Sequence, residues 1–186
     1  CFDGRSLLGV LLGKTGRRRD CVYGTQTTRG IIRGSACYPV RSVRSVRFKY
    51  IRNLNHEAVF YNVEATRPAG LLQTWIEIGK NDAAVAARAR FYQHRPAEEL
   101  YDLEKDPYEL RNLAKDPGHA EVKRQLGRRL RLWMEQQGDE GIATEMKATD
   151  RQGRRGNPKW TPYDPNVSPN PRNKKRNRDR QKRKDA

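Results

Sequence analysis

The sequence of 186 residues is poor in the side chains that build metal and redox sites. It has three cysteines and three histidines: Cys1, Cys21, Cys37, His56, His94 and His119. No two cysteines stand at the Cys-x-x-Cys spacing, so the sequence predicts neither a zinc ribbon nor a thioredoxin-like site. The histidines lack metal-ligand spacing, and so few cysteines do not fix the redox compartment.

Long apolar runs are absent as well. The run at residues 7–12 is far shorter than the roughly 20 residues of a membrane-spanning helix, so we predict no membrane span. No signal peptide opens the chain, which starts at Cys1 instead of a methionine. We therefore interpret it as the C-terminal part of a longer protein.

Acidic residues are scarce relative to basic ones, with 22 Asp and Glu against 39 Lys and Arg and a net charge of +17. Residues 150–186 hold 13 of the basic and 4 of the acidic residues, which leaves +8 for residues 1–149. Few apolar residues and five prolines in the last 37 residues predict a disordered basic tail, with non-specific polyanion binding as its one expected role.

The motifs bear on two functions that involve phosphate or nucleic acid. The triplet Gly13-Lys14-Thr15 lacks the glycine that a phosphate-binding loop needs five residues before its Gly-Lys pair, where Leu8 stands. The net charge favours a basic nucleic-acid-binding protein, yet no RRM, KH, helix-turn-helix or zinc-finger pattern occurs. That second function stays an alternative.

β-Branched and aromatic residues gather in the first third of the chain and predict strands near 20–25, 38–43 and 47–53. In the third, Phe48 and Tyr50 alternate with Lys49 and Ile51, which indicates an antiparallel strand with one packed face. Residues 44–46 have the length of a hairpin turn.

Helical periodicity follows. Residues 68–93 predict one or two helices, with a shared face of Leu71, Leu72, Trp75 and Ile78 and a cap from Asn81-Asp82 for the run at 83–92. A short strand at 99–103 precedes two Asp-Pro caps, at Asp106 and Asp116, each expected to begin a helix. The second helix spans 117–137, and its apolar face consists of Val122, Leu126, Leu130, Trp133 and Met134.

Two motifs in order resemble the C-terminal region of sulfatases, closest to the heparan N-sulfatase (sulfamidase) branch. They are "YPVRSVRSVRFKYIRNLN" at 38–55 and "EELYDLEKDPYELRNLA" at 98–114. The segments "FDGRSLL" at 2–8 and "VYGTQTTRGI" at 22–31 add to a resemblance that runs to about residue 146.

The resemblance implies the smaller subdomain of an alkaline-phosphatase-like enzyme. We expect an α+β fold, in which an antiparallel sheet of about four strands carries a packed C-terminal helix. Residues 1–19 would end the catalytic domain, 20–149 would form the subdomain, and 150–186 would be the tail.

Sulfatases use a formylglycine nucleophile made from cysteine, and a calcium ion held by acidic residues. The resemblance implies that these groups belong to the N-terminal domain, so we expect no catalytic and no metal-binding residue here and no activity of this chain alone. Cys37 stands in a Cys-x-Pro-x-Arg pentapeptide, but Val40 replaces the usual serine and the surroundings predict a strand. We interpret Cys37 as a half-buried cysteine of that strand.

The resemblance implies a sulfated carbohydrate as the parent's substrate, and it places the polar loop Gln26, Thr27, Thr28 and Arg29 toward the sugar. Arg29 is the candidate for pairing with a sulfate or uronate. A phosphodiesterase or phosphatase of the same superfamily stays an alternative, because a fold does not fix chemistry. The parent is expected to be exported.

Overall fold

A computed structural model describes residues 6–14, 16, 19–31, 33–63, 65, 67 and 70–151. Of the predicted basic tail at 150–186, only residues 150 and 151 are described. Residues 1–5 of the predicted segment 1–19 also lie outside the described residues.

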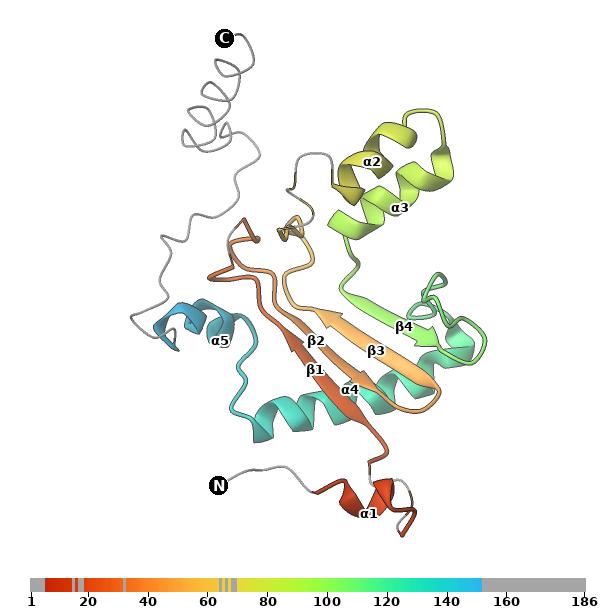
Figure 1. Cartoon of the computed structure of the whole chain (residues 1–186), viewed down its shortest axis with the longest axis vertical. Helices are drawn as coiled ribbons and strands as arrows, with labels where there is room; N and C mark the ends of the chain where they lie inside the picture. The colour runs from red at the N-terminus through yellow and green to blue at the C-terminus, as the bar shows by residue number, and fades with distance from the viewer. Residues whose placement is uncertain are drawn as a thin grey trace.

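The centre of the molecule is a four-stranded antiparallel sheet in the order β1-β2-β3-β4 (Figure 1). The strands are β1 (Val22–Gln26), β2 (Val40–Arg44), β3 (Phe48–Asn53) and β4 (Glu98–Asp102). This confirms the predicted fold class, because each of the four expected strands forms and pairs with its neighbour. In the register, Tyr23 faces Val43 and Tyr50 faces Leu100, so these four side chains share one side of the sheet.

The helices are α1 (Leu8–Leu11), α2 (Leu71–Ile78), α3 (Ala83–Gln93), α4 (Ala120–Gln136) and α5 (Ile142–Met146), with short 3-10 turns at Pro117–His119 and Ala148–Arg151. Of the three helix caps that the sequence predicts, the one before Ala83 and the one at Asp116 are present. The Asp82 carboxylate accepts from the N–H groups of Ala84 and Val85, and that of Asp116 accepts from Gly118 N–H. Gly138, with φ of +63°, follows the end of α4, close to the end at residue 137 that the sequence predicts.

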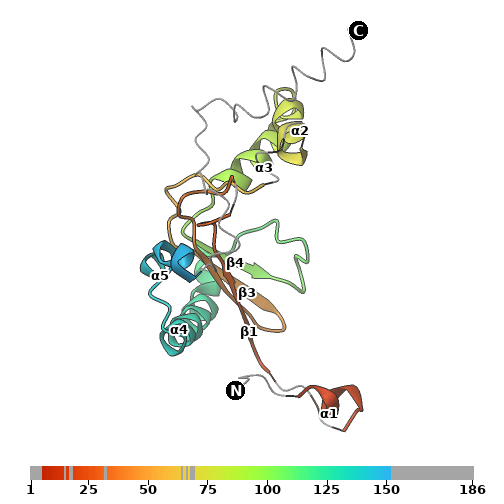
Figure 2. The ribbon, with the colours of Figure 1, turned by 60° about the vertical axis from the view of Figure 1, so that its left-hand side comes forward.

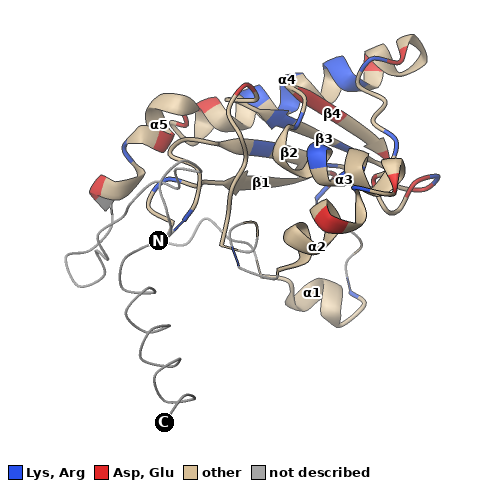
Figure 3. Ribbon diagram, turned by 90° about the horizontal axis from the view of Figure 1, so that it is seen from above, with Lys and Arg blue, Asp and Glu red and all other residues tan. Residues whose placement is uncertain are grey.

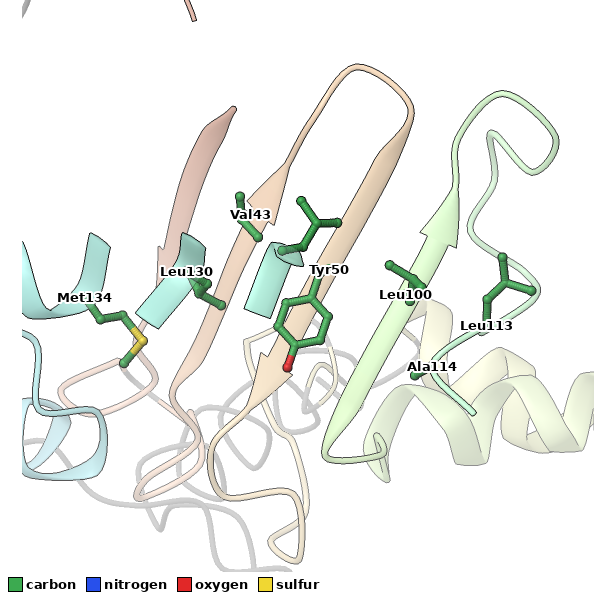
Figure 4. Close-up of a cluster of buried hydrophobic side chains, with 8 residues drawn as sticks. Val43, Tyr50, Leu100, Leu113, Ala114, Leu130 and Met134 are labelled. Atoms are coloured by element: carbon green, nitrogen blue, oxygen red, sulfur yellow. The ribbon is translucent and has the colours of Figure 1, made fainter. Parts of the chain in front are cut away.

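The long helix α4 covers one face of the sheet (Figure 2). Its buried residues are Leu126, Leu130 and Met134, which pack against the strand residues Val43, Tyr50 and Leu100 (Figure 4). Val122 and Trp133 pack at the margin of this cluster. The predicted apolar face of the helix is therefore the one that forms the core, and it fixes α4 across the strands.

The opposite face of the sheet carries a buried polar network around Glu99, which is fully buried. Arg95 donates to the Glu99 carboxylate at 2.8 and 2.6 Å, and Tyr101 and Asn53 each donate at 2.6 Å. Burial raises the pKa of Glu99, but the hydrogen bonds and charge of Arg95 outweigh it and hold this pKa below its ordinary value. The ion pair with Arg95 therefore stabilises the ionised form of Glu99 in the fold.

Helices α2 and α3 form a separate hairpin beside the sheet (Figure 1). Leu72 and Ala89 form its small core together with Ala65, and the helices approach so closely that a Cβ on Gly79 would lie 2.9 Å from the Ala86 Cα. The apolar face predicted for α2 is only partly buried, because two of its residues, Leu71 and Ile78, are exposed.

The helix predicted to begin at Asp106 does not form. Glu109, which lies in this segment, has a left-handed φ of +56°, and its carboxylate pairs with Lys49 at 2.8 Å. Instead, the segment bonds to the free edge of β4. The side-chain oxygen of Asn112 accepts from Leu100 N–H at 2.9 Å, and Leu113 N–H donates to the Leu100 carbonyl at 2.8 Å. Backbone bonding to the sheet therefore prevails over the local helix signal.

Candidate functional site

The predicted substrate loop lies at the end of β1, where it is bonded to α5. Glu145 is buried with 1% exposure, and its carboxylate accepts from Thr28 N–H at 2.8 Å and from Arg29 N–H at 2.9 Å. The hydroxyl of Thr27 donates to the same carboxylate. The loop thus forms a cradle for an anion, and the anion in it is a side chain of the protein itself.

The structure brings the four predicted residues together but gives them different positions. Gln26 and Thr27 are exposed, Arg29 is partly buried, and Thr28 is buried. The Thr28 hydroxyl accepts from Tyr38 N–H at 2.8 Å, which joins the loop to the start of β2. Whether these residues contact a substrate stays a prediction.

A cleft with a volume of about 430 Å³ opens beside this loop, between β1 and the corner where α4 leads into α5. Its polar lining comes from Thr25, Gln26 and Thr27 on one side and from Gln137 and Thr144 on the other. Trp133 of α4 also lines it. The cleft falls in the size range of small-molecule sites, and it contains two of the four predicted residues.

A buried ion pair lies in the wall of the cleft. Arg41 is 4% exposed and donates to both carboxylate oxygens of Asp139, one of them at 3.1 Å, and also to the Gln26 carbonyl at 3.2 Å. Burial pushes the pKa of Asp139 upward, yet hydrogen bonds from Arg41 and Gly141 N–H hold it below its ordinary value. The guanidinium of Arg41 is therefore committed within the fold.

Sequence reasoning missed Asp139 and Glu145. Asp139 bonds to a residue 98 positions away in the chain, and Glu145 bonds to residues 116 to 118 positions away. Local sequence patterns do not predict contacts over such separations. The alternation of β2 gave one indirect signal, because Arg41 shares the face of Val43 and a buried arginine requires a buried acid.

Cys37 lies three residues before β2 and outside any helix, so the strand predicted for it begins later, at Val40. Its thiol is partly buried. Burial raises the pKa of the Cys37 thiol, and the nearby Glu145 carboxylate adds to this effect more than Arg29 opposes it. A raised pKa disfavours the thiolate that a reactive cysteine needs.

A second cleft, of about 340 Å³, lies over the opposite face of the sheet and is floored by Gly24 and Ser42. Its two cations, Arg95 and Lys49, are paired with Glu99 and Glu109. It therefore offers a charge-balanced surface.

Basic residues line α4 (Figure 3), but several of them are paired. Lys123 lies 3.2 Å from Glu98, and Arg124 lies 2.7 Å from Glu121. The positive charge of this helix is thus partly neutralised within the fold, which weakens the nucleic-acid alternative without testing it.

Within residues 6–151 as described, no three His, Cys, Asp or Glu side chains are grouped so that they could hold a metal ion. The calcium ion that the resemblance implies therefore has no fitting ligand set in this part of the chain. Among the same residues, no helix has both the length and the apolar character needed to cross a membrane.

Comparison with characterised proteins decides the family. No protein-family model matches the chain. A protein of Formosa agariphila described as an ulvan-active sulfatase is 36% identical over 138 residues, which cover 74% of this chain. The chain belongs to the sulfatase family. The human N-sulphoglucosamine sulphohydrolase is 31% identical to it over 137 residues, or 71% of the chain.

This sulfatase chain spans only about a quarter of its relatives' length: 25% of the Formosa protein and 26% of the human one. That share fits the C-terminal subdomain predicted above. A solved structure of a 2-O GAG sulfatase is 22% identical, with a TM-score of 0.46 over 74% of this chain and 21% of that one.

Proposed function

We propose that the chain is the C-terminal subdomain of a sulfatase that hydrolyses sulfate esters or N-sulfates of a carbohydrate. The observation that carries this proposal is the match to two sulfatases at more than 30% identity, over about 70% of this chain but a quarter of theirs. In the net reaction one water is consumed, an S–O or S–N bond breaks, and sulfate leaves with an alcohol or an amine.

The formylglycine nucleophile and the calcium site would lie in the rest of the parent protein. Arg41 is held by Asp139, and Cys37 lies outside any helix in a pentapeptide that has Val40 in place of the usual serine, so we propose neither side chain to attack or clamp a sulfate. We infer that this subdomain acts in positioning, which lowers the barrier by holding the sugar in a reactive orientation. Gln26, Thr27, Thr28 and Arg29 remain the residues proposed for that role.

The test uses the longer protein of which this chain would be the end. Sulfate release from ulvan oligosaccharides and from N-sulfoglucosamine would be measured by ion chromatography, with bis(4-nitrophenyl) phosphate as the alternative substrate. We expect release of sulfate and no cleavage of the phosphodiester. Hydrolysis of the phosphodiester without sulfate release would overturn the proposal in favour of the phosphodiesterase alternative.

A further inference from the structure

The cleft at the corner of α4 and α5 differs in its chemistry from a sulfate site. We propose that it binds an uncharged sugar ring of the carbohydrate, and not the ring that carries the reacting sulfate. That the ligand is a sugar rests on the proposed function. That this sugar is uncharged rests on the residues that line the cleft.

The polar groups of the cleft match sugar hydroxyls. The amide of Gln137 presents a donor and an acceptor at the end of α4. Gln26 of β1 contributes its backbone to the lining, and its carbonyl accepts from Arg41. Thr25 adds a hydroxyl from β1. A sugar hydroxyl donates and accepts at once, so neutral groups of this kind satisfy it without a charge.

Trp133 supplies the apolar part of the wall. Its ring is stacked on Tyr23, with centroids 4.9 Å apart and planes within 2° of each other. The stacking fixes the indole against the sheet before any ligand arrives, so little side-chain entropy is lost on binding. A sugar ring combines C–H surfaces with hydroxyl edges, which suits a rigid aromatic ring beside neutral polar groups.

The charge of the lining argues against an anion. It contains one cation, Arg41, and two carboxylates, Asp139 and Glu145. Arg41 donates to both carboxylate oxygens of Asp139 and to the carbonyls of Gln26 and Val40, so four of its five N–H groups are bonded within the fold. The remaining carboxylate leaves the lining with one net negative charge, which repels a sulfate in a partly desolvated site.

The test is a titration of the whole chain with sugars, monitored by two-dimensional ¹⁵N–¹H NMR at the Trp133 indole and the Gln137 side-chain amide. The probes are glucose, rhamnose, xylose and N-acetylglucosamine, with N-acetylglucosamine 6-sulfate as the charged counterpart. We expect saturable shifts at Trp133 with at least one neutral sugar, and binding of the sulfated sugar about tenfold weaker. The proposal is overturned if none of the four neutral sugars shifts these signals, or if the sulfated sugar binds more tightly.

Gln137→Ala is the matched variant, because the side chain is exposed and its loss leaves the core untouched. Gln136→Ala is its control: that residue is also exposed, ends α4, and does not line the cleft. We expect Gln137→Ala to weaken neutral-sugar binding about fivefold, as for one lost hydrogen bond, and Gln136→Ala to leave it unchanged. Equal effects of the two variants would contradict the proposal.

The outcome is separable from that of the proposed function. Sugar binding without sulfate release by the longer protein would refute the sulfatase proposal and leave the cleft standing. Sulfate release by the longer protein without neutral-sugar binding by this chain would support the sulfatase proposal and refute the sugar site in the cleft.

Discussion

Glu145 holds the loop at 26–29 to α5, and the loss of stability on removing its carboxylate can be worked out from the structure. In Glu145→Ala, the N–H groups of Thr28 and Arg29 lose an acceptor at 2.8 and 2.9 Å in a site closed to water on the Thr28 side. A buried donor left unsatisfied costs about 1 to 3 kcal/mol, so we expect the free energy of unfolding to fall by about 3 kcal/mol. Glu145→Gln keeps one acceptor oxygen and should cost about 1 kcal/mol.

The measurement is urea unfolding followed by far-ultraviolet circular dichroism, combined with hydrogen exchange at the Thr28 and Arg29 amides. Glu140→Ala is the matched control, since Glu140 is 67% exposed and lies 3.7 Å from Lys147, a surface pair worth at most about 0.5 kcal/mol here. The reasoning is refuted if Glu145→Ala behaves as Glu140→Ala does, or if the two amides exchange no faster than in the unchanged protein.

Three further predictions concern the core, acid stability and the cysteine. Leu130→Ala, at a fully buried position, should lower the free energy of unfolding by about 3 kcal/mol; an equal loss in Leu132→Ala, 46% exposed, would contradict the packing described. The folded-state pKa values of Glu99 and Asp139 lie below their ordinary values of 4.5 and 3.8. The two carboxylates therefore contribute their full stability above their ordinary pKa values, and this stability is lost as the pH falls through their folded-state pKa values. A free energy of unfolding that does not fall between about pH 7 and about pH 3 would oppose this prediction. In the parent enzyme Cys37→Ala should leave the rate of sulfate release nearly intact, and an inactive, folded variant would make Cys37 a catalytic residue.

Local patterns predicted most of the fold. Period-two alternation predicted β3 as a strand with one packed face, whereas both of its faces are buried, one at Tyr50 and the other at Ile51. The spacing of Leu126, Leu130 and Met134 selected the buried side of α4. These patterns work because a strand or a helix that covers one core repeats its apolar residues at its own period.

Contacts between distant segments could not be predicted in the same way. Asp106 carries a strong local helix signal, yet Asn112 and Leu113 bond to β4 and keep the segment out of a helix. The candidate site depends on contacts of this kind, because Glu145 and Asp139 reach it only after the chain has returned along α4. Sequence alone therefore found the loop at Gln26 but neither the carboxylate in it nor the cleft beside it.

The most direct test of the account is whether residues 1–186 alone release sulfate. The account places the hydrolytic groups in the rest of the parent, so purified chain incubated with 4-nitrophenyl sulfate, with calcium present, should produce no more 4-nitrophenol than buffer does. Turnover that rises in proportion to the chain's concentration would contradict the account, since it would require a nucleophile within this chain.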